Sequence, residues 1–170
     1  MKVAVIGCGT IANAAHIPSY MNNPEAEIKY FCDIIPERAE AAVEKYGCGT
    51  AITDYHIALN DPEIEAVLIC SSTDTHSKYI IEAAHAGKHI FCEKPIDHDV
   101  NKILEVKKAL ENSNVKYQVG FNRRFDHNFK AARKAVEGGQ IGDLNILKVC
   151  SRDPGAPPVS YIKVSGGIFL

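Results

Sequence analysis

The chain has 170 residues and a mass of 18.6 kDa, and its 46% apolar and 24% charged residues are typical of a folded globular domain. This composition excludes intrinsic disorder and collagen-like repeats, and the length suffices for one full core and the beginning of a second. The 19 Lys and Arg against 21 Asp and Glu give a net charge of −2, which offers no broad cationic surface for nucleic acid or anionic lipid. No apolar run approaches the roughly 18 residues of a membrane span, so we expect a non-membrane protein with a small-molecule partner.

The cysteine pattern argues against a metal site. The six cysteines form no C-x-x-C pair, which is the usual spacing of a zinc site or a redox disulfide. Cys32, Cys70, Cys92 and Cys150 lie in apolar, strand-like runs, where a free thiol packs as a small hydrophobic side chain. Because free thiols are typical of a reducing compartment, we expect a cytoplasmic protein without a bound metal.

Strand-like and helical patterns alternate along the first 120 residues. Short apolar runs rich in β-branched residues predict strands at residues 3–6, 28–32, 66–70, 89–92 and 116–119. Helical spacing of apolar residues predicts helices at residues 10–17, 36–46, 74–86 and 100–110. Pro18 interrupts the first helix, Pro36 opens the second, and Asp99 is the expected N-cap of the last. This alternation needs crossover connections, so we predict an α/β fold with a doubly wound, mostly parallel sheet.

The pattern changes after Gly120. Apolar residues at helical spacing run from Phe125 to Val136 in a basic segment that stops at Gly138. Residues 144–151 then alternate between apolar and polar, which predicts an antiparallel strand for which the chain offers no second strand. We therefore interpret residues 1–120 as one domain and residues 121–170 as the incomplete start of an α+β substrate domain with a mainly antiparallel sheet.

A glycine motif follows the first predicted strand and opens the first helix. Gly7-x-Gly9-x-x-Ala12 is the dinucleotide-binding fingerprint in its required context, with Thr10 and Ile11 completing the loop. Gly7 permits a tight turn, Gly9 lets the backbone approach a pyrophosphate, and Ala12 keeps the helix close to the sheet. The sequence therefore predicts a Rossmann domain that binds a dinucleotide at the start of its first helix.

Asp33 ends the second predicted strand, about 20 residues after the glycine motif. A carboxylate at this position accepts hydrogen bonds from the hydroxyls of the adenosine ribose and repels a 2′-phosphate. Because Ile34 and Ile35 follow, with no Arg directly after Asp33, we predict a preference for NAD over NADP. The alternative interpretation is that Asp33 only caps the turn into Pro36.

A hydroxyl-rich turn, Ser71-Ser72-Thr73, follows the strand at residues 66–70, and His76 comes early in the next helix. Open α/β sheets bind their ligands at this carboxyl edge, so we assign these four residues to the cofactor site. Helix capping explains Thr73 without a ligand, and an exposed position explains His76 equally well.

Glu93-Lys94-Pro95 ends the strand at residues 89–92 on the same edge of the sheet. This position brings the Lys94 ammonium into the crevice where a nicotinamide would lie, and Glu93 joins the predicted cofactor site. The alternative is an ordinary surface lysine.

These motifs, together with Gly87-Lys88-His89, resemble the glucose-fructose oxidoreductase and inositol dehydrogenase (Gfo/Idh/MocA) family across the whole chain. Three later segments resemble the inositol 2-dehydrogenase branch in particular: residues 120–126 (GFNRRFD), 151–158 (SRDPGAPP) and 164–170 (VSGGIFL). The resemblance implies an NAD-dependent oxidoreductase that oxidises a secondary alcohol of a cyclic polyol or sugar by hydride transfer to nicotinamide.

The resemblance also implies residue roles. Lys94 would be the catalytic lysine that contacts both the nicotinamide ribose and the reacting hydroxyl, Arg124 would lie near cofactor and substrate, and Asp153 would bind a polyol hydroxyl. The family motif that begins at Gly166-Gly167 continues into an Asp and a proton-accepting His, which this sequence does not contain. We therefore expect a truncated portion that is inactive alone, from a protein whose full-length form is a homo-oligomer, a dimer or tetramer.

Two alternatives stay open. The protein can be a dehydrogenase of another sugar or of a nucleotide sugar in the same family. It can also be a non-catalytic NAD-binding sensor module that kept the fold and lost the chemistry. Lys94 argues against the sensor, because a sensor has no need for an ammonium group at the hydride-transfer position.

Overall fold

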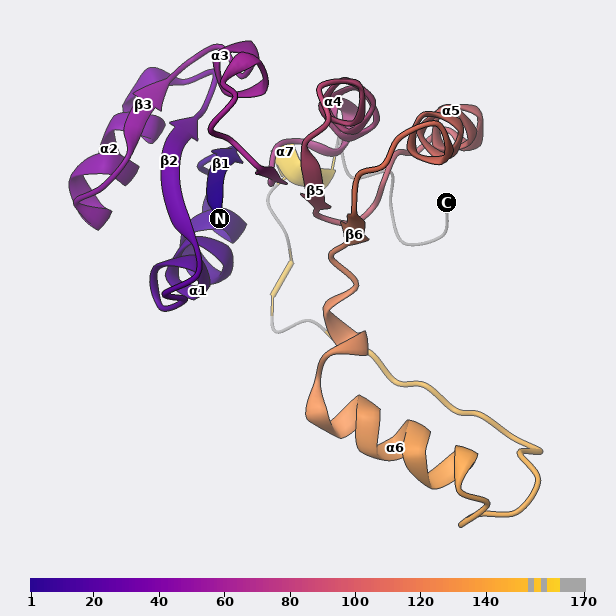
Figure 1. Ribbon diagram of the computed structural model, residues 1–170. Coiled ribbons are helices and arrows are strands. Elements are labelled where there is room, and N and C mark those ends of the chain that lie inside the picture. Colours follow the sequence, from indigo (N-terminus) through magenta and orange to yellow (C-terminus); the bar gives the residue numbers. More distant parts are fainter. Residues whose placement is uncertain (153–154, 157–158, 163–170) are drawn as a thin grey trace. The chain divides into compact units, whose positions relative to one another are not determined.

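Residues 1–152, 155–156 and 159–162 are described by the computed structural model in Figure 1. The chain divides into two compact units, one from Met1 to Gly120 and a smaller one that begins at Phe121. The first unit contains a six-stranded sheet with its covering helices, and the candidate site lies in it.

The sheet has the strand order β3-β2-β1-β4-β5-β6, and every neighbouring pair is parallel. Its strands are β1 (Lys2–Ile6), β2 (Glu27–Cys32), β3 (Thr50–Ile52), β4 (Ala66–Ile69), β5 (His89–Cys92) and β6 (Tyr117–Val119). The strand order reverses at β1, which pairs with β2 on one side and β4 on the other. This arrangement is the doubly wound Rossmann topology, and it opens a crevice between the loops that follow β1 and β4.

Helices cover both faces of the sheet. They are η1 (Ala12–His16), α1 (Ile17–Met21), α2 (Pro36–Tyr46), α3 (His56–Asn60), α4 (Thr73–His85) and α5 (Val100–Glu111). Ile17 and Ala39 belong to one buried cluster with Phe31, whereas Ile80 and Val106 belong to a second cluster. All four residues of β4 are buried, as expected for a parallel strand that is covered on both faces. Among the described residues, no helix is long and apolar enough to cross a bilayer.

Local signals in the sequence set the helix ends. Pro36 occupies the first turn of α2, where a missing N–H leaves no hydrogen bond unmade. Gly47 ends this helix in a left-handed conformation with φ of 67°, and its N–H donates to the carbonyl of Val43. Asp99 caps α5 by accepting the Asn101 N–H at 2.8 Å, as predicted.

The first helix differs from its prediction. Helical residues continue through Pro18 to Met21 instead of ending before the proline. The π-helical turn η1 ends at His16, two residues before Pro18. A proline ring clashes with the carbonyl four residues earlier in a regular α-helix, and the wider turn relieves that clash.

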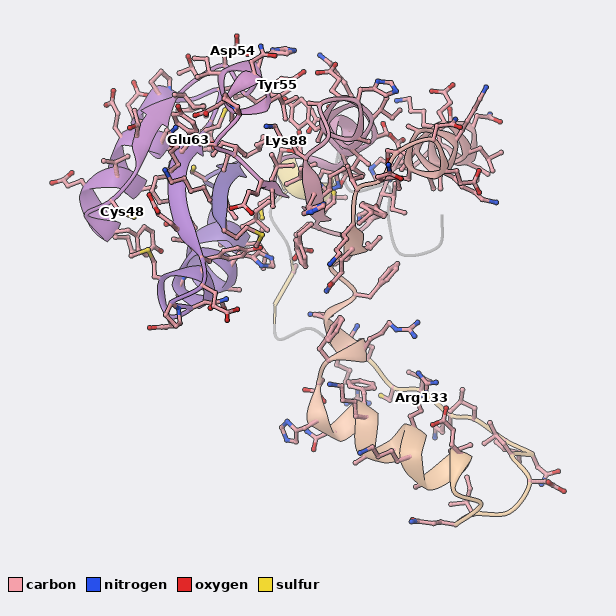
Figure 2. The ribbon with its side chains drawn as sticks, viewed as in Figure 1. Cys48, Asp54, Tyr55, Glu63, Lys88 and Arg133 are labelled. Carbon is pink, nitrogen blue, oxygen red and sulfur yellow. The ribbon has the colours of Figure 1, made fainter. Side chains whose placement is uncertain are left out.

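A buried lysine fixes the loop between α3 and β4. Lys88, labelled in Figure 2, is 7% exposed, and its Nζ donates to the carbonyls of Asp61 at 2.7 Å and Ile64 at 2.8 Å. The ammonium group therefore donates to two carbonyls of this loop, and the Asp61 carbonyl also accepts the Ile64 N–H at 3.1 Å.

In its described residues, the second unit contains the short helix η2 (Asn122–Arg124), α6 (His127–Glu137) and α7 (Val159–Ile162). Asp126 caps α6 by accepting the N–H groups of Asn128 and Phe129. The strand predicted at residues 144–151 is not formed, and its apolar side chains are exposed. A strand needs a neighbour for its backbone hydrogen bonds, and the described part of this unit provides none.

Candidate cofactor site

A cavity of about 400 Å³ lies at the carboxyl ends of β1, β2 and β4, where the strand order reverses. We call it the main cavity. Its lining residues are Ile6, Gly7, Gly9, Cys32, Asp33, Ile34, Arg38, Thr53, Tyr55, Cys70, Ser71, Ser72, Thr75 and Tyr79. A second hollow of about 400 Å³, the adjoining cavity, is lined by Cys8, Gly9, Thr10, Asn13 and Arg38. The glycine loop thus borders both cavities.

The glycine loop requires glycine at one position and leaves space at another. Gly7 has φ of 96°, and a Cβ there would lie 2.6 Å from the backbone of Cys70 and of Ser71. A Cβ at Gly9 would meet no atom within 4 Å, so its backbone is open to a ligand. Ala12 is fully buried, as close helix-to-sheet packing requires. These three positions have the properties that a pyrophosphate-binding loop needs.

Asn13, Thr10 and Ile11 complete the turn that follows β1. Asn13 donates through Nδ2 to the carbonyls of Cys8 at 2.8 Å and Gly9 at 3.1 Å, and these two hydrogen bonds fix the loop. Thr10 borders the adjoining cavity, whereas Ile11 is exposed and borders neither cavity. Asn13 was not recognised in the sequence, because an Asn in a helical segment carries no signal of its own.

Asp33 is 7% exposed and joins the glycine loop to the turn after β2. Its Oδ2 accepts the Cys8 N–H and its Oδ1 accepts the Ile35 N–H, both at 2.9 Å. Asp33 therefore caps the turn into Pro36, which was the alternative interpretation of the sequence, and it also lines the main cavity. A carboxylate oxygen can accept more than one hydrogen bond, so acceptor capacity remains for ribose hydroxyls.

Arg38 is a site residue that the sequence analysis missed. Its Nη1 lies 4.0 Å from Asp33 Oδ1, and the residue borders both cavities. No cation directly follows Asp33 in the sequence, but the first turn of α2 brings Arg38 back toward that carboxylate. A cation therefore stands at the predicted ribose position.

The loop after β4 supplies hydroxyl groups. Ser71 and Ser72 border the main cavity, and the Oγ of Ser71 lies 2.7 Å from the Oγ1 of Thr75. Thr73 begins α4 and borders neither cavity. Tyr55, labelled in Figure 2, borders the same cavity and packs against Tyr79 with ring centroids 4.3 Å apart. This aromatic wall was not predicted from the sequence.

His76 is buried, with 1% of its surface exposed, so the exposed position considered from the sequence is wrong. Its Nδ1 lies 2.7 Å from the Pro95 carbonyl oxygen, and its Nε2 lies 3.1 Å from that of Ser71. The ring therefore links the loop after β4 to the turn after β5, and it borders neither cavity.

Glu93 and Lys94 lie in the turn after β5. Glu93 Oε1 is 2.7 Å from His16 Nε2, and Glu93 Oε2 accepts the Lys94 N–H at 3.1 Å. Lys94 is exposed, and the peptide bond between Lys94 and Pro95 is cis. Neither Glu93 nor Lys94 borders the two cavities.

Thiols at this edge of the sheet are protonated at neutral pH. Burial raises the pKa of Cys8 and of Cys32 to about 12, with the Asp33 carboxylate as the second cause. Burial also raises the pKa of Cys70 to about 12, with the charge of Glu93 adding to the effect. These thiols therefore act as packing groups and not as thiolate nucleophiles. Among the described residues, no group of three His, Cys, Asp or Glu side chains is arranged to hold a metal ion.

Two predicted site residues belong to the other part of the chain. Arg124 lies in η2 of the second unit and is exposed. Asp153 lies outside the described residues.

The parallel sheet, the glycine loop and the buried carboxylate after β2 together define a dinucleotide-binding Rossmann domain. The chain belongs to the Gfo/Idh/MocA family, whose model, described as "Oxidoreductase family, NAD-binding Rossmann fold", matches residues 1–121. The predicted family, the Rossmann fold and NAD as the cofactor are thereby confirmed.

Several relatives match almost the whole chain. Inositol 2-dehydrogenase of Rhizobium meliloti (strain 1021) is 44% identical over 169 residues, which are 99% of this chain and 50% of the relative. A probable dehydrogenase from Thermotoga maritima has a crystal structure with a TM-score of 0.94 and 41% identity, covering 100% of this chain and 51% of that one. Scyllo-inositol dehydrogenase from Lactobacillus casei, solved with bound NAD(H) and scyllo-inositol, has a TM-score of 0.79 and 30% identity, covering 84% of this chain and 42% of that one. The chain thus spans about half the length of the relatives that it matches.

Proposed function

We propose that this chain supplies the NAD-binding part of a dehydrogenase that oxidises a secondary alcohol of a cyclic polyol, of the myo-inositol 2-dehydrogenase type. The observation that carries the proposal is the glycine loop bonded to the buried Asp33 in a chain that is 44% identical to an inositol 2-dehydrogenase. The residues fit the cofactor: a side chain at Gly7 would strike the backbone, Gly9 is open, and Asp33 keeps acceptor capacity.

In this proposal, three loops of the first unit hold the cofactor. Gly9 and its neighbours receive the pyrophosphate, and Asp33 accepts the ribose hydroxyls and disfavours a 2′-phosphate. His76 and Glu93 act from behind the loops through the hydrogen bonds described above. The full set of proposed cofactor residues is Gly7, Gly9, Thr10, Ile11, Ala12, Asp33, Ser71, Ser72, Thr73, His76, Glu93, Lys94 and Arg124.

Bound NAD supplies a nicotinamide carbon that accepts a hydride. The exposed Lys94 ammonium is proposed as the catalytic group, because a cation beside the reacting hydroxyl stabilises the negative charge that develops on its oxygen. Arg124 and Asp153 are proposed to bind hydroxyls of the polyol. We further propose that the 170-residue chain binds NAD without completing the reaction by itself, because it spans about half of the inositol 2-dehydrogenase it resembles.

Lys94→Met in the intact enzyme tests this proposal. Methionine matches the length of lysine and removes the charge, so hydride transfer from myo-inositol should slow by roughly 100- to 1,000-fold while the NAD dissociation constant changes little. Single-turnover formation of NADH at saturating NAD measures the chemical step directly. A normal single-turnover rate would exclude Lys94 from catalysis, and an intact enzyme that oxidises no inositol would favour another sugar or nucleotide sugar as substrate.

We also propose a cytoplasmic location and a homo-oligomeric full-length form. The six cysteines are free thiols, which favours a reducing compartment. Size measurement of the intact enzyme in solution tests the oligomeric state.

A further inference from the structure

We propose that His16 is a positioning residue that holds the turn carrying Lys94 against the helix that follows the glycine loop. The inference rests on the proposed function, because it concerns the placement of the proposed catalytic lysine. His16 is the last residue of the π-helical turn η1, and its partner Glu93 lies 77 residues later in the chain. The contact therefore joins the first βα connection to the turn after β5.

The contact is short and shielded from water. His16 Nε2 lies 2.7 Å from Glu93 Oε1, and the two side chains are 18% and 14% exposed. An ionised carboxylate can only accept hydrogen bonds, so Nε2 carries the proton and donates it. A hydrogen bond to a charged acceptor in a partly desolvated position is stronger than its equivalent at an exposed surface.

Packing fixes both partners in place. The His16 ring meets the edge of Phe91 with centroids 5.0 Å apart and an interplanar angle of 61°. A Cβ added to Gly120 would lie 3.2 Å from Glu93 Oε1 and 3.1 Å from the Phe91 ring. The absence of a side chain at Gly120 thus leaves the space that the carboxylate occupies.

Glu93 transmits this anchoring to Lys94. While Oε1 accepts from His16, Oε2 accepts the backbone N–H of Lys94 at 3.1 Å. The other end of the turn is held by His76, whose Nδ1 lies 2.7 Å from the Pro95 carbonyl oxygen. The backbone on both sides of the Lys94 side chain is therefore tied to elements that border the cofactor site, while the ammonium itself stays exposed.

The arrangement couples cofactor binding to the order of this turn. A dinucleotide that stiffens the glycine loop and η1 also stiffens the position of His16, and through Glu93 that of Lys94. Coupling between two sites is reciprocal. Loss of the His16–Glu93 contact should therefore change the NAD dissociation constant by no more than the factor by which NAD slows exchange in the turn.

Hydrogen exchange of the Lys94 amide in the 170-residue chain, with and without NAD, tests the proposal. In the wild-type chain, NAD should slow this exchange by about threefold or more. In His16→Phe, exchange without NAD should be about fivefold faster, as expected for losing one anchoring hydrogen bond, and the slowing by NAD should disappear. The NAD dissociation constant should change by less than about threefold.

Three further variants make the result specific. His16→Gln places an amide N–H near the position of Nε2 and should restore slow exchange. Gly120→Ala keeps the His16 side chain but adds a Cβ 3.2 Å from Glu93 Oε1 and 3.1 Å from the Phe91 ring, so it should speed Lys94 exchange in the same direction as His16→Phe. His85→Phe is the matched control, because His85 is exposed at the end of α4 and its side chain makes no hydrogen bond among the described residues.

The possible results separate the two proposals. If the Lys94 amide of His16→Phe exchanges at the same rate as in the wild type, with and without NAD, the positioning role is overturned. A wild-type chain that binds NAD without any slowing at Lys94 would overturn the coupling. If the wild-type chain fails to bind NAD, the proposed function fails, and the NAD-free comparison of His16→Phe with wild type still decides whether His16 anchors the turn.

Discussion

Asp33→Ser is the most informative test of cofactor choice. The carboxylate accepts the N–H groups of Cys8 and Ile35 at 2.9 Å each and is 7% exposed, so it orders the glycine loop and also faces the proposed ribose position. Serine keeps a hydroxyl group but removes the charge and shortens the side chain. Because Arg38 Nη1 lies 4.0 Å from this carboxylate, the substitution also releases a cation.

The expected changes in NAD and NADP affinity follow from the strength of hydrogen bonds to charged groups. Hydrogen bonds to a charged acceptor contribute about 1.5 to 3 kcal/mol, so losing those from the ribose should weaken NAD binding by roughly 10- to 150-fold. In Asp33→Ser, the 2′-phosphate of NADP no longer meets the negative charge of Asp33, and the freed Arg38 guanidinium can pair with that phosphate. NADP binding should therefore strengthen by about tenfold, which narrows or reverses the preference for NAD.

Titration calorimetry of both cofactors against four chains measures these contributions. The chains are the wild type, Asp33→Ser, Arg38→Ala and the double variant, and they form a double-mutant cycle. Arg38→Ala should remove the gain in NADP affinity in the Asp33→Ser background. Tighter binding of NADP than NAD by the wild-type chain would refute the reasoning about Asp33, and an NADP gain that persists without Arg38 would refute the role of the released cation.

Three further predictions concern stability. Gly7→Ala should lower the free energy of unfolding by about 3 kcal/mol, because Gly7 has a positive φ and the added Cβ would lie 2.6 Å from backbone atoms. Gly9→Ala should change the free energy of unfolding by less than about 1 kcal/mol and should weaken NAD binding. Equal stabilities of the two variants would contradict the steric argument. Lys88→Met should cost about 2 kcal/mol, since the buried hydrogen bond to the Ile64 carbonyl is lost and the Asp61 carbonyl keeps only the Ile64 N–H as a donor. An unchanged denaturant midpoint would contradict this. Amides after Gly120 should exchange faster than those of β4, because the apolar side chains at residues 144–149 are exposed; equal protection in a monomer would contradict it.

The sheet was predictable because its strands carry dense local signals. The continuous apolar run at β4 and the Pro36 and Gly47 boundaries of α2 each determine structure within a few residues of sequence. β3 and α3 were missed, because three and five residues are too few to show a period and depend on packing for their conformation. The predicted strand at residues 144–151 had the correct alternation but no neighbour, which a pattern within one segment cannot reveal.

The candidate site was predictable only where its chemistry is local. The glycine motif and Asp33 carry their function in residue type and spacing, and the structure places both at the main cavity. Arg38 reaches the site through the turn of a helix, and His16 reaches Glu93 across 77 residues. Partners as distant as His16 and Glu93 become neighbours only when a parallel sheet brings its carboxyl ends to one edge.

The charges at that edge explain how one site can receive an anionic cofactor beside several acidic groups. The Asp33 carboxylate accepts two backbone N–H groups, Glu93 is hydrogen-bonded to His16, and the neighbouring thiols keep their protons because burial raises their pKa values. The side chains of Arg38 and Lys94 remain exposed at the turns after β2 and β5. Arg38 borders both cavities beside the proposed ribose position, whereas Lys94 lies in the turn where the proposed reaction develops an alkoxide. The acidic groups at this edge therefore hold the backbone in place, and the exposed cations remain available to the ligands.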